Sequence, residues 1–96
     1  MPHQRQDALT DQMFDVMCSI AGDVDGGFDG RRIAAWLLRT FFQSNTPVTA
    51  SFYLADDDSA LTSSEINFAR YRSTALGCYD AGDWLRNQAE QAQNSN

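Results

Sequence analysis

The chain has 96 residues and a formal charge of −6, from thirteen acidic side chains against seven basic ones, all of them arginine. This length fits one domain spanning 1–96, and a hydrophobic share of 43% predicts a packed core rather than a disordered chain. Seven dispersed arginines among thirteen acids argue against direct nucleic-acid binding, which needs a basic patch to neutralise phosphates.

The sequence also lacks the residues that a metal site or a membrane span needs. Cys18 and Cys78 do not form a CxxC pattern, and His3 is the only histidine, so the sequence lacks the clustered ligands of a zinc site. No apolar run approaches the roughly 18 residues of a membrane span, and the first residues lack the apolar segment of a signal peptide. We therefore expect a cytoplasmic protein with reduced thiols and with no cofactor, metal or membrane partner.

The first predicted helix runs from Asp7 to Ala21, after a frayed start at 1–6. Asp7 can cap its beginning, and Gly22 can end it as a left-handed residue. Apolar side chains recur at helical spacing on one face, namely Leu9, Met13, Val16, Met17 and Ile20.

Residues 23–30 predict a tight loop, because they contain three glycines and three aspartates. A calcium loop would need ligands where Gly27 and Trp36 stand, so we interpret the segment as a connection between helices. Asp29 is then the N-cap of a second helix over 31–43. Its two apolar rows predict the central core helix: Ile33, Leu37 and Phe41, and beside them Ala34, Leu38 and Phe42.

Residues 48–54 fit two predictions. Alternating apolar and polar side chains suit a single short strand, whereas Thr46 and Pro47 suit the start of a short helix. The helix is favoured because a strand needs a partner, and the sequence shows no second convincing strand.

The clearest local signal is a capping box from Thr62 to Glu65, which predicts a helix from Ser63 to about Leu76 that Gly77 ends. A last helix follows from about Asp80 to Gln91, with a frayed polar end at 92–96. The predicted fold is all-α, a compact bundle of four to five short helices.

Three aspartates recur every four residues along the first predicted helix: Asp7, Asp11 and Asp15. Each like-charge pair at this spacing costs about 0.2–0.5 kcal/mol. The stripe is therefore either a solvated face or a surface for a basic partner. A second acidic run lies in a predicted loop, at Asp56, Asp57 and Asp58.

Three further side chains are candidates for partner binding. Phe14 and Trp36 lie at the edges of apolar faces, where either core packing or an interface would place them. Arg72 projects between apolar positions of its helix. An unpaired charge in a core is costly, so Arg72 either pairs with an acid or lies on a partly open face.

Catalysis is not expected, because the chain has no lysine and His3 lies in the predicted frayed start. The segment from Arg31 to Leu38 resembles helices in small proteins of bacterial mobile elements. A short acidic chain without evident catalytic groups is similar in kind to phage-encoded inhibitors, including anti-CRISPR proteins, which often occupy nucleic-acid-binding grooves with acidic surfaces.

That resemblance implies a non-catalytic interaction module whose partner is a protein with a basic surface. Two alternatives stay open at this point. One is a small structural or regulatory subunit that forms a homodimer through the same aromatic side chains. The other is a small enzyme.

Overall fold

The computed structural model describes residues 4–22, 24–25, 27–42 and 59–94. In chain order the elements are α1 (Gln4–Ala21), β1 (Val24–Asp25), β2 (Phe28–Asp29), α2 (Gly30–Leu37), the π-helical segment η1 (Leu38–Phe42), α3 (Ser63–Ala75) and α4 (Tyr79–Asn94). They form a compact all-α globule of four helices with one short strand pair, which confirms the predicted fold class. The Cα radius of gyration is 12.7 Å, as expected for a folded chain of this size.

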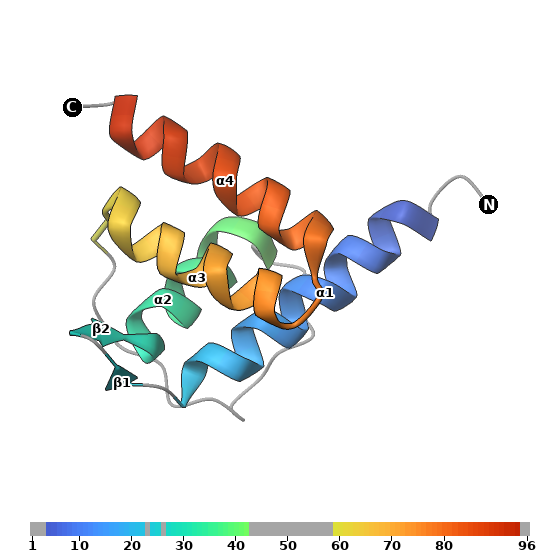
Figure 1. The fold of residues 1–96 in the computed structure, drawn as a ribbon, viewed down its shortest axis with the longest axis horizontal. Coiled ribbons are helices and arrows are strands. Elements are labelled where there is room, and N and C mark those ends of the chain that lie inside the picture. The colour runs from blue at the N-terminus through green and yellow to red at the C-terminus, as the bar shows by residue number, and fades with distance from the viewer. Residues whose placement is uncertain (1–3, 23, 26, 43–58, 95–96) are drawn as a thin grey trace.

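The helices cross in the arrangement of Figure 1. α3 and α4 run side by side in opposite directions, and α1 crosses the end of this pair where the two helices join. The β-hairpin lies beside the C-terminal end of α1. The start of α1 and the end of α4 lie on opposite sides of the molecule. No helix of the described ranges has the length and apolar character needed to cross a membrane.

Local capping explains where α2 and α3 begin. The Asp29 carboxylate accepts a hydrogen bond from the Arg31 backbone N–H at 3.0 Å, as an N-cap does. The predicted capping box is confirmed, because Thr62 and Glu65 each accept the other's backbone N–H, at 3.2 and 2.9 Å. Gly77 ends α3 in the left-handed region with φ of 76°, also as predicted.

Helix ends differ from the prediction in three places. α1 begins at Gln4 and α4 continues to Asn94, so both helices include residues that were expected to be frayed. Glutamine, arginine and alanine, which dominate both extensions, are favourable in helices. Gly22 follows the end of α1 but does not adopt the expected left-handed conformation.

The segment predicted as a loop contains a minimal hairpin. Val24 pairs with Asp29 and Asp25 with Phe28 in an antiparallel register. Gly27 has a φ of 85°, a conformation that glycine adopts without strain. Strands of two residues are too short for an alternating pattern to reveal them. The ambiguous segment 48–54 lies outside the described residues.

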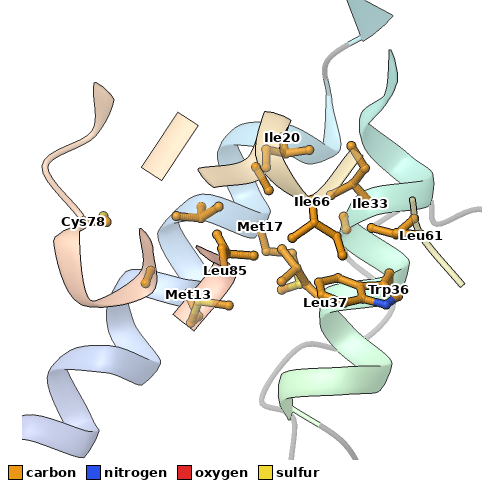
Figure 2. Packing of buried hydrophobic residues seen from close by; sticks show 14 of the residues in the cluster. Met13, Met17, Ile20, Ile33, Trp36, Leu37, Leu61, Ile66, Cys78 and Leu85 are labelled. Atoms are coloured by element: carbon orange, nitrogen blue, oxygen red, sulfur yellow. The ribbon is translucent and has the colours of Figure 1, made fainter. Parts of the chain in front are cut away.

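The core lies between α1, α2 and the α3–α4 pair (Figure 2). The predicted face of α1 is confirmed, since four of its apolar side chains are fully buried: Met13, Val16, Met17 and Ile20. Ile33 and Leu37 of α2 are fully buried opposite them, with Leu61, Ile66 and Leu85 from the later part of the chain.

The central helix packs differently from its prediction. Leu38 and Phe41 are only partly buried, whereas Trp36 is 8% exposed and belongs to the core. A π-helical turn has more residues than an α-helical one, so η1 rotates the positions that follow Leu37. Phe42 is buried, as predicted, and Phe41 packs edge-on against Trp84 with ring centroids 5.3 Å apart.

Candidate protein-interaction surface

Two aspartates of the acidic stripe lie on the solvent side of α1. Asp11 and Asp15 are both exposed, and they stand one turn apart, opposite the buried face that carries Met13 and Met17. Within the described residues, no hydrogen bond or ion pair engages either carboxylate. Asp7 belongs to the same helix, but its side chain is outside the described part, as are Asp56, Asp57 and Asp58.

Several arginines lie beside acidic side chains. The Arg32 Nε donates to Glu65 Oε2 at 2.8 Å, and this pair joins α2 to the start of α3. Exposed, longer contacts join Arg31 to Asp29 at 3.8 Å and Arg86 to Asp83 at 3.9 Å. None of these ion pairs involves Asp11 or Asp15.

Arg72 has a structural role that the sequence did not reveal. Its Nη1 donates to the backbone oxygen of Ser19 at 3.1 Å and to the Ser19 hydroxyl at 2.8 Å. The guanidinium carbon also lies 5.7 Å from the centroid of the Phe68 ring. Carbonyls in the last turn of a helix lack helical partners and carry partial negative charge, and α1 has no basic residue of its own there. Arg72 therefore supplies the cation that caps the end of α1.

The two aromatic candidates contribute to packing. Phe14 is partly buried against the core, and Trp36 packs on Trp84 with centroids 5.9 Å apart. Large apolar side chains are exposed elsewhere, namely Tyr71 at 69%, Leu76 at 45% and Tyr79 at 66%. Tyr71 could have been found from helical spacing, since it lies opposite the Ile66, Ala69 and Ser73 face of α3.

Both thiols are free, with Cys18 exposed on α1 and Cys78 buried at the start of α4. Burial raises the pKa of each thiol, and the negative charge of Asp15 raises both pKa values further. A thiol with a raised pKa is a weak nucleophile at neutral pH. Over the described ranges, no three His, Cys, Asp or Glu side chains gather closely enough to hold a metal ion.

This arrangement provides negative charge and apolar contact area. Two exposed carboxylates project from one helix, and exposed apolar side chains flank the nearby α3–α4 turn. Comparison of the chain with protein-family models, with curated proteins and with solved structures finds no match.

Proposed function

We propose that the protein is a non-catalytic interaction module that binds a basic surface of a partner protein through the carboxylates of α1. The observation that carries this proposal is the exposure of Asp11 and Asp15 without an ion pair in the described part of a chain of net charge −6. In its sharpest form the module is an inhibitor of the anti-defence kind, which occupies the nucleic-acid-binding surface of its partner. Complementary charge is the interaction that such a surface provides.

The stability of the helix alone does not explain the aspartate stripe of α1. Like charges one turn apart cost about 0.2–0.5 kcal/mol per pair. The partial positive charge of a helix start offsets this cost only in the first turn, and Asp15 is eleven residues beyond Gln4. The competing explanation is a solvated face that only keeps the protein soluble.

The same charge disfavours other partners. A net charge of −6 repels nucleic acid and anionic lipid, so the partner we propose is a protein. Two free thiols fit a reducing compartment, and the cytoplasm is the location that we propose.

The test compares two charge variants that each remove two negative charges. The stripe variant carries Asp11→Asn and Asp15→Asn. The control variant carries Asp83→Asn and Glu90→Gln, which are exposed positions of α4. Each protein is immobilised, host lysate is passed over it, and bound proteins are eluted with a salt gradient.

We expect a partner that binds the native protein and the control variant but not the stripe variant. Its affinity should fall steeply with salt, because the screening length shortens from about 30 Å at 0.01 M to about 8 Å at 0.15 M. A partner that binds the stripe variant equally well, or whose affinity does not depend on salt, would contradict the proposal.

A further inference from the structure

The turn between α3 and α4 carries exposed apolar side chains. Leu76 is 45% exposed and Tyr79 is 66% exposed. Isolated apolar residues are common on protein surfaces. Leu76 and Tyr79 differ from such isolated residues because the turn that carries them lies beside the acidic helix α1.

Three hydrogen bonds fix α1 along this turn. Arg72 of α3 binds Ser19, and the side-chain oxygen of Gln12 accepts the backbone N–H of Ala81 in α4 at 3.1 Å. Asp15 lies between Gln12 and Ser19 on α1, just as residues 76–79 lie between Arg72 and Ala81. The two segments therefore run alongside each other, and Figure 1 shows the turn beside the middle of α1.

Further observations agree with this placement. Leu76 follows Arg72 by one helical turn, so it lies on the side of α3 that faces α1. Cys78 lies within the turn. Burial raises the pKa of its thiol most, and the negative charge of Asp15 raises this pKa further. Leu76 and Cys78 of the turn thus lie close to Asp15, and the exposed Tyr79 follows Cys78 at the start of α4.

We propose that Asp15, Leu76 and Tyr79 form one docking surface for an arginine-rich segment of the partner protein. This inference rests on the proposed function and specifies the partner's chemistry. A guanidinium pairs with a carboxylate through two hydrogen bonds and also stacks on an aromatic ring, whereas an ammonium does neither as well. Leu76 offers an apolar contact to the methylene stem of the same arginine.

The test uses an oligo-arginine and an oligo-lysine peptide of equal length, so that charge is matched. Affinities are measured by calorimetry at low ionic strength. The native protein should bind the arginine peptide about two- to fivefold more tightly, the ratio that an exposed cation–π contact supplies. Tyr79→Leu should reduce this preference, because the ring contact is lost while the Asp15 carboxylate still favours a guanidinium. Tyr71→Leu is the matched control, because Tyr71 is equally exposed but points about 100° around α3 from Arg72, away from α1.

The outcomes separate the two proposals. Equal affinity for both peptides, or an arginine preference that Tyr79→Leu leaves undiminished, overturns the docking surface. The proposed function still stands in that case if Asp11→Asn with Asp15→Asn weakens binding of both peptides. If the stripe variant binds both peptides as tightly as the native protein, or if neither peptide binds the native protein, both proposals fail.

Discussion

Replacing Glu65 with glutamine perturbs the contact that joins α2 to the start of α3. Glu65 Oε2 accepts from Arg32 Nε at 2.8 Å, while Oε1 accepts the Thr62 backbone N–H at 2.9 Å. Arg32 also donates to the Ser59 hydroxyl at 2.7 Å and to the Ala60 carbonyl at 3.0 Å. Arg32 therefore holds the segment before α3 against α2 through hydrogen bonds, and holds the first turn of α3 through the ion pair.

The expected loss follows from partial burial. The side chains of Arg32 and Glu65 are each 17% exposed, so the pair is shielded more than a surface ion pair but less than a fully buried one. Glutamine keeps an oxygen for the capping box but loses the charge. Hydrogen bonds to charged groups contribute about 1.5–3 kcal/mol against about 1 for neutral ones, so Glu65→Gln should cost about 1–2 kcal/mol.

Thermal unfolding measures this loss. For a domain of this size, 1 kcal/mol shifts Tm by roughly 4–8 °C, so we expect Tm to fall by about 4–16 °C. Glu90→Gln, the same change at an exposed position of α4, should alter stability by less than about 0.5 kcal/mol. Equal Tm values for the two variants would refute the structural role of the pair.

The pair also predicts a pH dependence. Burial by itself raises the pKa of Glu65, but the hydrogen bonds and charge of Arg32 and the hydrogen bonds of Thr62 lower the pKa more, so it lies below its ordinary value. A carboxyl whose pKa is lower in the folded state stabilises the fold above its unfolded pKa, about 4.3, and this stability is lost as the pH falls through the folded pKa. The stability difference between the native protein and Glu65→Gln should shrink over this acid range, and a constant difference would contradict the reasoning.

Further predictions concern packing, capping and thiol reactivity. Gly82→Ala places a methyl group 2.9 Å from the buried Ser73 hydroxyl, so urea unfolding should show a loss of about 1–2 kcal/mol that a second change, Ser73→Ala, largely restores. Arg72→Met should destabilise by about 1–2 kcal/mol and Arg72→Lys by less, because lysine retains a cation at the end of α1; equal stability of the native protein and both variants would count against this cap. Cys18 should react slowly with neutral iodoacetamide at pH 7 and faster in Asp15→Asn, since removing that charge lowers the thiol pKa; an unchanged alkylation rate would contradict the coupling.

The sequence predicted features that depend on short-range rules. Asp29 and the Thr62–Glu65 capping box mark helix starts because their side chains bind backbone groups two or three residues away. The buried face of α1 followed from helical spacing. The exposure of Asp11 and Asp15 followed from the same spacing, since they lie opposite that face.

Long-range contacts could not be predicted in this way. Arg72 meets Ser19 across 53 positions of sequence, and Arg32 meets Glu65 across 33 positions. Burial of Trp36 depends on packing against Trp84 from another helix. Tyr79 is a candidate binding residue only because long-range contacts hold α1 alongside the turn. No local sequence pattern predicts those contacts.

The most direct test of the central claim is a map of where a basic ligand binds. The isotopically labelled protein is titrated with the oligo-arginine peptide, and amide chemical-shift changes are recorded at low and high salt. We predict that the largest changes lie at Asp11–Asp15 of α1 and at residues 76–79, and that they vanish at high salt. Changes that are as large around Asp83 and Glu90, on the outer face of α4, would show that the peptide follows overall charge alone and would contradict the account.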